Sequence, residues 1–328
     1  MSKETVARAL RQARSALILS HLNPDGDAVG SALGLMWALR QRGALARVVL
    51  ADPVPPNLLF LPGAEEVERQ VPPEGADIVV VLDSSSPDHV GEPFAEATAR
   101  SNLVVNIDHH PTNGAFGDVN WIAPAYPAVA QMIYHLLPSL GVQPDEATAT
   151  CLLTGLVTDT NGFSTPTTDS NLLRDAAELM DAGAPLPDII QQAYLNRSLT
   201  QVRLWAQALQ ALQWEDGIVW AVNTPEMRRA VGASERDSSD LSTFLLTIRE
   251  ARIAASFTLL DDGRVKVSLR AKPGYNVAEV AARLGGGGHP PAAGATLDMP
   301  LEQAVQTVIS ALKAQVAATT PHAQLQLS

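Results

Sequence analysis

Short apolar runs alternate with helical patterns through the first part of the chain. Four runs rich in Val, Ile and Leu, each bounded by polar or turn-forming residues, predict buried strands at Ala16–Ser20, Ala46–Leu50, Asp77–Leu82 and Asn102–Ile107. The spacing of apolar residues predicts helices at Ala28–Gln41, Ala128–Leu137 and Asp145–Val157. Strands that alternate with helices are typical of a doubly wound parallel sheet, so we expect an α/β fold here.

The second part of the chain predicts a smaller mixed sheet with helices. Strands are expected at Gly217–Val222, Ala251–Leu260 and Arg264–Ala271, and helices at Ser239–Ile248, Val277–Leu284 and Leu301–Val316. Pro185–Pro187 interrupts the pattern, and one or two helices follow over 188–212. We therefore expect a first domain over 1–185, a helical linker over 186–212 and a second α/β domain over 213–328. Segments 51–75 and 84–97 are expected to be surface connections.

The composition is that of a soluble globular protein. The chain has 328 residues, of which 46% are hydrophobic and 18% charged, which fits about two domains and excludes a disordered or fibrous chain. No apolar run reaches the roughly 20 residues of a membrane-spanning helix, and the N-terminus lacks a signal-peptide cleavage site. Cys151 is the only cysteine, so no internal disulfide can form. We expect a cytoplasmic protein with no membrane partner.

The excess negative charge is confined to the first part. Residues 1–199 contain 11 basic residues (Lys and Arg) but 23 acidic ones (Asp and Glu), whereas residues 200–328 contain 12 basic and 12 acidic residues. The net charge of the whole chain is −12. A solvated acidic surface explains such an excess, and so does a cluster of carboxylates that binds divalent cations. Long nucleic acids favour a continuous basic surface, so this balance argues against them as partners.

Candidate metal ligands follow the ends of the predicted strands. Loops at the carboxyl ends of parallel strands bind ligands in open α/β sheets, and imidazole and carboxylate groups are donors to divalent metals. Each residue alone is also explained as a helix cap or a turn residue. Together they predict a pair of divalent ions with one bridging carboxylate, suited to in-line displacement at phosphorus. The candidate ligands are His21, Asp25, Asp27, Asp83, His109 and Asp159, and Asp108 and His110 flank His109.

A glycine-rich run marks the second part. Gly285–Gly288 precedes His289, and successive glycines let backbone N–H groups approach an anion closely while the histidine adds a donor. Ser268, Arg270 and Lys272 alternate along a predicted strand and share one face, where an arginine can hold a phosphate through two hydrogen bonds. A flexible loop and a solvated strand face are the structural alternatives.

Other polar and aromatic residues have structural explanations. His135 falls within a helical apolar pattern and is expected to be partly buried with satisfied hydrogen bonds. Trp205, Trp214 and Trp220 are expected to lie in the core.

These motifs resemble those of the DHH phosphoesterases. The segments are HLNPDGDAVGS at 21–31, the strand end at Asp83, IDHH at 107–110 and TGLVTDT at 154–160. SLRAK at 268–272 and GGGGHPPAAGA at 285–295 resemble the DHHA1 domain that accompanies them. Among two-domain members the chain is most similar to the NrnA-type nanoRNases, which also act as pAp phosphatases. The resemblance implies a catalytic DHH domain, a substrate-binding DHHA1 domain and an active site in the cleft between them.

The resemblance also implies two metal ions and a ligand set for each. His21 and Asp25 would bind one ion, Asp27, His109 and Asp159 would bind the other, and Asp83 would bridge them. Mn²⁺ is the expected ion, because imidazole ligands suit it better than Mg²⁺, which is the alternative.

For the remaining residues the resemblance implies contacts with substrate. His110 would contact the scissile phosphate and protonate the leaving oxygen, and Asp108 would orient a histidine. The residues implied to hold the distal phosphate or nucleotide are Ser268, Arg270, Gly287, Gly288 and His289.

The implied activity is hydrolysis of short RNA or DNA oligonucleotides to mononucleotides, together with dephosphorylation of pAp, by in-line attack of a metal-bound hydroxide. One alternative is a phosphodiesterase of cyclic or linear dinucleotides such as c-di-AMP and pApA. Another is a nucleotide-binding protein without catalysis on the same scaffold. Members of the family are often dimers, so the resemblance allows a homodimer, although no interface is legible in the sequence.

Overall fold

The computed structural model describes residues 3–318. The chain divides into two compact units, one over residues 1–196 and the other over 197–328. The division falls within the segment predicted as a linker, which contains α8 (Leu186–Ile190), a π-helical turn (Gln191–Leu195) and α9 (Leu199–Gln210). No helix among the described residues is long and apolar enough to cross a membrane.

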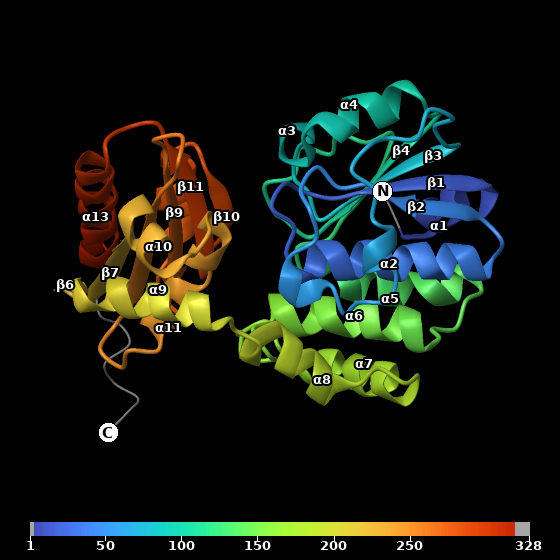
Figure 1. The fold of residues 1–328 in the computed structure, drawn as a ribbon. Coiled ribbons are helices and arrows are strands. Elements are labelled where there is room, and N and C mark those ends of the chain that lie inside the picture. Colours follow the sequence, from blue (N-terminus) through green and yellow to red (C-terminus); the bar gives the residue numbers. More distant parts are fainter. Residues whose placement is uncertain (1–2, 319–328) are drawn as a thin grey trace. The chain divides into compact units, whose positions relative to one another are not determined.

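The first unit is built on a five-stranded parallel sheet (Figure 1). Its strands are β1 (Ser15–Leu19), β2 (Leu45–Val48), β3 (Ile78–Leu82), β4 (Val104–Asp108) and β5 (Val119–Ile122). They are arranged in the order β2-β1-β3-β4-β5, and every neighbouring pair is parallel. The four predicted strands are confirmed within a few residues, whereas β5 was not predicted.

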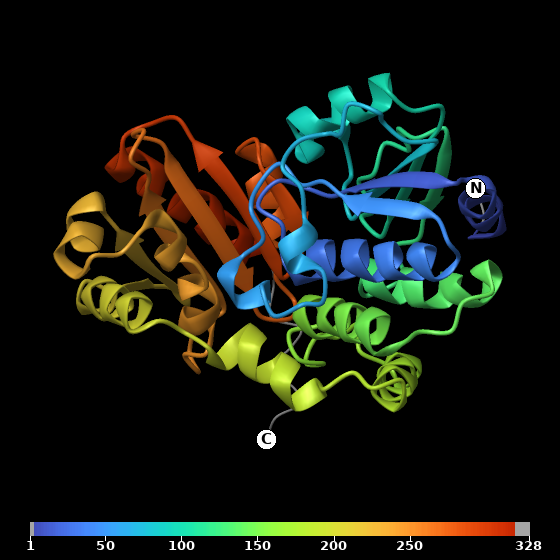
Figure 2. The same ribbon diagram turned by 45° about the vertical axis from the view of Figure 1, so that its right-hand side comes forward.

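Helices cover both faces of this sheet, as Figures 1 and 2 show. One face carries α2 (Gly26–Gln41), α5 (Val129–Leu140) and α6 (Glu146–Asp159), and the other carries α3 (Pro87–Val90) and α4 (Glu92–Ala99). Alternate side chains of one strand therefore enter different cores: Ile18 packs toward α2, and Leu17 and Leu19 pack toward α4. The doubly wound α/β fold is confirmed.

Two segments of the first unit differ from the sequence prediction. The surface connection expected over 84–97 is wrong, because this segment forms α3 and most of α4. Each of these helices carries a proline in its first turn, where the missing N–H costs nothing. α7 (Ser170–Asp181) was not predicted either, and it packs beside α6. The remaining helix of this unit, α1 (Lys3–Gln12), contacts α5.

Close packing of α2 against α6 surrounds one of the candidate ligands, Asp27. Gly26, Gly30 and Gly34 lie one helical turn apart along α2, and a Cβ atom on any of them would collide with α6. From α6, Gly155 faces α2, and a Cβ there would lie 2.7 Å from Oδ1 of Asp27. The absence of side chains thus brings the two helix backbones together and leaves room for the Asp27 carboxylate.

The second unit contains a six-stranded mixed sheet in the order β10-β11-β9-β8-β7-β6. Its strands are β6 (Gln213–Glu215), β7 (Ile218–Asn223), β8 (Ile253–Leu259), β9 (Val265–Ala271), β10 (Gly287–His289) and β11 (Ala292–Leu297). The pair β7–β8 is parallel, and the other neighbouring pairs are antiparallel. The smaller mixed α/β domain is confirmed.

Helices pack on the two faces of this second sheet. α12 (Val277–Arg283) and α13 (Leu301–Ala318) form a core with alternate residues of β9, whereas α9 and α11 (Leu241–Leu246) pack on the other face, beside β7 and β8. α10 (Pro225–Val231) contacts α9. Trp205 is buried as predicted, but the core position predicted for Trp214 is wrong: this residue lies on the short edge strand β6 and is 47% exposed.

Candidate metal centre

The carboxyl edge of the first sheet carries the candidate metal ligands. The chain leaves β1 to form β2 on one side and then crosses back to form β3 on the other. Open α/β sheets bind ligands at such a point, where the strand order reverses. His21, Asp25 and Asp27 follow β1, Asp83 follows β3, and the 108–110 segment ends β4. Asp159 is the last residue of α6. The structure thus brings together all the ligands predicted from the sequence.

Asp83 lies between two groups of donors. Its Oδ2 is 3.6 Å from Nε2 of His21, and its Oδ1 is 3.3 Å from Nε2 of His109. The residue is buried, and Oδ1 has no hydrogen bond of good geometry within residues 3–318. Its φ of +53° is in the left-handed region, which costs a non-glycine residue about 1–3 kcal/mol. A strained carboxylate with a buried unsatisfied oxygen fits a ligand that is completed by a cation.

The first group of donors contains His21, Asp25 and Asp83, and one possible ligand atom from each lies within 4.8 Å of the others. Oδ1 of Asp25 is 3.7 Å from Nε2 of His21. The same oxygen accepts hydrogen bonds from the backbone N–H groups of Asp27 and Ala28 at 3.0 Å, so Asp25 caps α2. Its capping role and its place in the donor group coexist, because a carboxylate has several lone pairs.

The second group contains Asp27, His109 and Asp159, again within 4.8 Å. Nε2 of His109 is 3.6 Å from Oδ2 of Asp159. Asp27 is fully buried and accepts hydrogen bonds from the N–H groups of Val129 at 2.6 Å and Ala130 at 2.8 Å, at the start of α5. The helix N-terminus fixes this carboxylate and favours its negative charge.

The pKa values of the cluster show how strongly its charges interact. Burial and the charge of Asp83 raise the pKa of Asp27 to about 7, and burial and the charge of Asp27 raise the pKa of Asp159. Burial alone would lower the pKa of His109, but Asp83 beside it raises the pKa well above its ordinary value. So many carboxylates in one buried place need positive charge, and these donors therefore fit divalent metal ions.

His110 is held by a carboxylate next to the candidate metal ligands. Oδ1 of the buried Asp108 is 2.7 Å from Nδ1 of His110 and accepts the backbone N–H of His109 at 2.8 Å. Burial would lower the pKa of His110, but its hydrogen bond with Asp108 raises it. The planes of the His109 and His110 rings lie at 84° to each other, and each ring has a nitrogen within 3.6 Å of Oδ1 of Asp83.

Sequence reasoning missed Asn113. Its Nδ2 donates to Oδ2 of Asp108 at 2.6 Å, to Oδ1 of Asn106 at 2.9 Å and to the carbonyl oxygen of Ser84 at 3.0 Å. Asn113 thus holds the carboxylate that holds His110. In the sequence Asn113 precedes Gly114, and Asn–Gly is a common turn pair. The sequence therefore indicates only a turn at this position.

The candidate phosphate-binding residues lie together within the second unit. Arg270 pairs with Ala292 across β9 and β11, and Ala292 pairs with His289 across β11 and β10. Side chains in register share a face, so Arg270 and His289 lie on the same side of the sheet, opposite α12 and α13. Ser268 lies on that face too, because it is two residues from Arg270 on the same strand.

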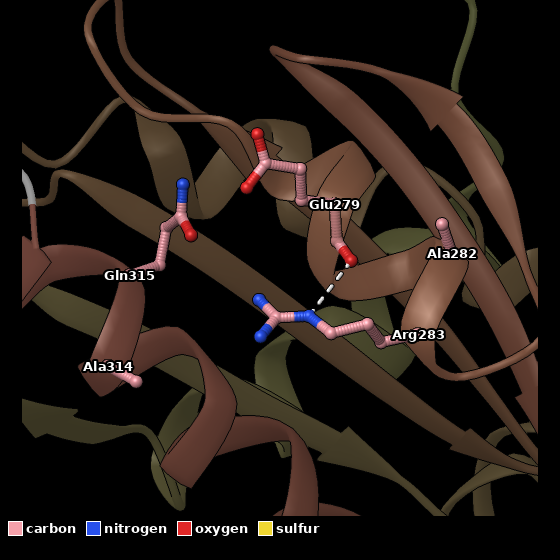
Figure 3. Close-up of a pocket in the computed structure, with 5 residues that line it drawn as sticks. All are labelled: Glu279, Ala282, Arg283, Ala314 and Gln315. Carbon is pink, nitrogen blue, oxygen red and sulfur yellow. Dashed lines mark hydrogen bonds between the residues drawn. The ribbon is translucent and has the colours of Figure 1, made fainter. Parts of the chain in front are cut away.

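The glycine run is part of the sheet. Gly287 and Gly288 belong to β10, so the flexible-loop alternative is wrong. A Cβ atom on Gly288 would lie 2.6 Å from Cα of Ala293, and its φ is +135°, so glycine is required at this position. A separate groove of this unit, between α12 and α13, is lined by other residues (Figure 3): Glu279, Ala282, Arg283, Ala314 and Gln315.

The fold and the site define a two-domain α/β protein with a candidate divalent-metal centre. Residues 15–156 match the model of the DHH family, N-terminal domain, and residues 224–318 match that of the DHHA1 domain. The chain belongs to the DHH/DHHA1 phosphoesterase family.

Known relatives span almost the whole chain. The bifunctional oligoribonuclease and PAP phosphatase NrnA of Thermus thermophilus is 38% identical over 91% of this chain and 89% of its own length. The protein of the same name from Bacillus subtilis is 27% identical over 90% and 93%. In fold, the chain is similar to an exopolyphosphatase-related protein from Bacteroides fragilis, with a TM-score of 0.88, 23% identity and coverage of 97% of both chains.

Proposed function

We propose that this protein hydrolyses short oligonucleotides to mononucleotides and removes a phosphate from pAp. The observation that carries the proposal is Asp83, a buried carboxylate that belongs to the first group of donors and whose Oδ1 lies 3.3 Å from Nε2 of His109 in the second. Phosphoester hydrolysis commonly uses such paired sites. The substrates follow from the relatives, whose names state both activities and whose similarity covers both domains. Mn²⁺ as the ion, a cytoplasmic location and a homodimer remain predictions.

The first unit would hold two divalent ions. In this proposal His21 and Asp25 bind one, Asp27, His109 and Asp159 bind the other, and Asp83 bridges them. Ions held there would polarise the phosphate oxygens and lower the pKa of a water molecule. The protein fixes this arrangement in advance, because the amides of α5 hold Asp27 and the α2 cap holds Asp25.

His110 would handle the proton of the leaving oxygen. Its Nδ1 faces Asp108, and the raised pKa keeps its ring protonated over a wider pH range than a free histidine. A general acid needs its proton at the operating pH. Asp108, which Asn113 in turn holds, would orient the ring.

The second unit would bind the other end of the substrate. Arg270 and His289 lie on one face of its sheet and are suited to an anion, with Ser268 as a further donor. The backbone of Gly287 and Gly288 would allow a phosphate to approach closely. A substrate held at both ends must be short, and the lack of excess positive charge in residues 200–328 agrees with this.

A panel of substrates with defined ends tests the proposal. It contains 5′-phosphorylated and unphosphorylated oligomers from dimers to decamers, pAp, cyclic dinucleotides and pApA, each incubated with Mn²⁺. The expected result is release of mononucleotides, fastest from the shortest oligomers, and phosphate release from pAp. Digestion of long strands with dimers and pAp untouched would contradict it, and faster turnover of cyclic dinucleotides would favour that alternative.

A matched pair of variants shows that the activity belongs to this site. Asp83→Asn removes one negative charge from the centre, whereas Asp88→Asn makes the same change at an exposed position on α3. Activity should be lost in the first variant and kept in the second. Equal activity in both would assign the hydrolysis to another site or to a contaminating nuclease.

A further inference from the structure

His109 makes a contact that fixes its chemical form. Its Nδ1 lies 3.0 Å from the backbone carbonyl oxygen of Tyr126. A carbonyl only accepts hydrogen bonds, so Nδ1 carries the proton and the neutral ring has its lone pair on Nε2. Nε2 is the atom that faces Asp83 and Asp159. Histidines that bind metals generally use their second nitrogen in this way.

The chain around Tyr126 is stiff. Pro124 and Pro127 flank it, and proline restricts both its own φ and the conformation of the residue before it. The N–H of Tyr126 donates to the carbonyl oxygen of Ala123 at 3.1 Å, and the N–H of Ala123 donates to that of Asp108 at 2.9 Å. The segment is thus tied to the end of β4, which carries His109.

The same segment reaches a second ligand. It leads directly into α5, whose N–H groups at Val129 and Ala130 donate to Asp27. His109 and Asp27 belong to the same group of donors. A displacement of residues 126–130 would therefore disturb two of the three residues of that group.

The side chain of Tyr126 is anchored away from the metal centre. Its hydroxyl is 3.2 Å from Nδ1 of His135 on α5, and Nε2 of His135 is 2.9 Å from Oδ2 of Asp175 on α7. Gln131 also donates to this carboxylate, at 2.6 Å. A carboxylate only accepts, so Nε2 of His135 donates to Asp175, and the hydroxyl of Tyr126 can donate to Nδ1. The Tyr126 ring also packs edge-on against Trp121, with centroids 5.9 Å apart.

We propose that Tyr126 is a positioning residue for the metal site of Asp27, His109 and Asp159, and that His135 and Asp175 hold it in place. A chain of hydrogen bonds runs from Asp175 through His135 to the hydroxyl of Tyr126. The backbone carbonyl of Tyr126 then orients the ring of His109. The prediction that His135 is partly buried with satisfied hydrogen bonds is confirmed. In this proposal those hydrogen bonds hold Tyr126 in position. The inference rests on the proposed metal centre and is independent of the substrate.

Titration of metal-free protein with Mn²⁺ by calorimetry tests the proposal. Tyr126→Phe removes the hydroxyl but keeps the ring and the backbone, and Asp175→Asn weakens the same chain of contacts from its far end. Tyr134→Phe is the matched control. The hydroxyl of Tyr134 on α5 contacts Glu178 on α7, so it links the same two helices as His135 and Asp175, but it makes no hydrogen bond to Tyr126. Loss of the group that hydrogen-bonds directly to a ligating histidine weakens metal binding about 10- to 100-fold. Tyr126→Phe and Asp175→Asn remove contacts one or more steps further from the histidine, so each should weaken Mn²⁺ binding about three- to tenfold.

The expected result is weaker Mn²⁺ binding in Tyr126→Phe and Asp175→Asn, and unchanged binding in Tyr134→Phe. Hydrolytic activity of the first two should return toward wild type at saturating Mn²⁺, which a general loss of stability would not produce. Binding within twofold of wild type in Tyr126→Phe, or equal weakening in Tyr134→Phe, would overturn the inference. The titration contains no substrate, so failure of the proposed function would appear separately, in the substrate panel.

Discussion

Oδ1 of Asp83 and Nε2 of His109 are 3.3 Å apart, although the two residues directly follow different strands. β3 and β4 are neighbours in the sheet, so the turn after each strand delivers its side chain to the same edge. The left-handed conformation of Asp83 turns the chain sharply just after β3. The sharp turn at Asp83 and the pairing of β3 with β4 together place the Asp83 carboxylate beside the His109 ring.

Replacement of Asp83 should abolish hydrolysis and reduce the metal content. Asp83→Asn keeps the shape of the side chain, and asparagine tolerates a positive φ, so the fold should survive. Loss of the shared charge should lower kcat/KM by about 10²- to 10³-fold or more. Metal analysis after desalting and a dinucleotide assay would measure both effects. Full metal occupancy with full activity would show that the ligand assignments are wrong.

A methyl group at Gly155 should disturb the metal site as well as the packing. In Gly155→Ala the new Cβ would lie 2.7 Å from Oδ1 of Asp27 and 2.5 Å from Cβ of Ala130. Overpacking of this kind costs about 1–3 kcal/mol of stability. Gly34→Ala is the control, because it overpacks the same helix pair against the side chain of Leu152, away from Asp27.

Thermal unfolding and Mn²⁺ titration would separate these two effects of Gly155. Both variants should unfold at a lower temperature than the wild type, and only Gly155→Ala should bind Mn²⁺ more weakly. Equal metal affinity in the two variants would show that Gly155 serves packing alone.

Binding of metal should release protons. Asp83 raises the pKa of His109, and Asp25 and Asp83 raise the pKa of His21, although burial alone would lower both, so in the metal-free protein each ring keeps its second proton to a higher pH than a free histidine does. Asp27, with a pKa of about 7, is partly protonated too. Metal ligands must be deprotonated, so the apparent affinity should rise with pH between about pH 6 and about pH 8. Calorimetry in buffers of different ionisation enthalpy measures the release. Heat independent of the buffer and a flat affinity would contradict it.

Arg270 should affect binding more than chemistry. If its guanidinium holds a substrate phosphate, Arg270→Ala should raise KM for a dinucleotide by about tenfold or more, with a smaller change in kcat. Lys266→Ala is the matched control, because Lys266 is an exposed cation on the same strand and the same face. A collapsed kcat with an unchanged KM would instead place Arg270 at the reacting phosphate.

Residues next to strand ends were predictable from the sequence. His21, Asp83 and His109 each follow a short run of buried apolar residues, and parallel strands bring their carboxyl ends to one edge. Asp159 was a weaker signal, because it ends a helix and only the packing of α6 against α2 brings it to Asp27.

Weakly patterned segments were not predictable. α3, α4 and the short strand β5 bury few side chains of their own, so their periodicity is faint and the rest of the sheet decides their structure. Trp214 shows the same limit, because a large apolar residue suggests a core position and only the sheet order places it on an edge strand.

The sequence by itself determined the α/β class, the ligand types and the strand ends that carry them, because these depend on local pattern and on residue chemistry. The supporting contacts were decided by tertiary structure alone: the amides of α5 on Asp27, the amide of Asn113 on Asp108 and the Tyr126 carbonyl on His109. Backbone groups are present at every residue, and a single asparagine or tyrosine has no distinctive spacing. Only the folded chain specifies which of them contact a candidate metal ligand.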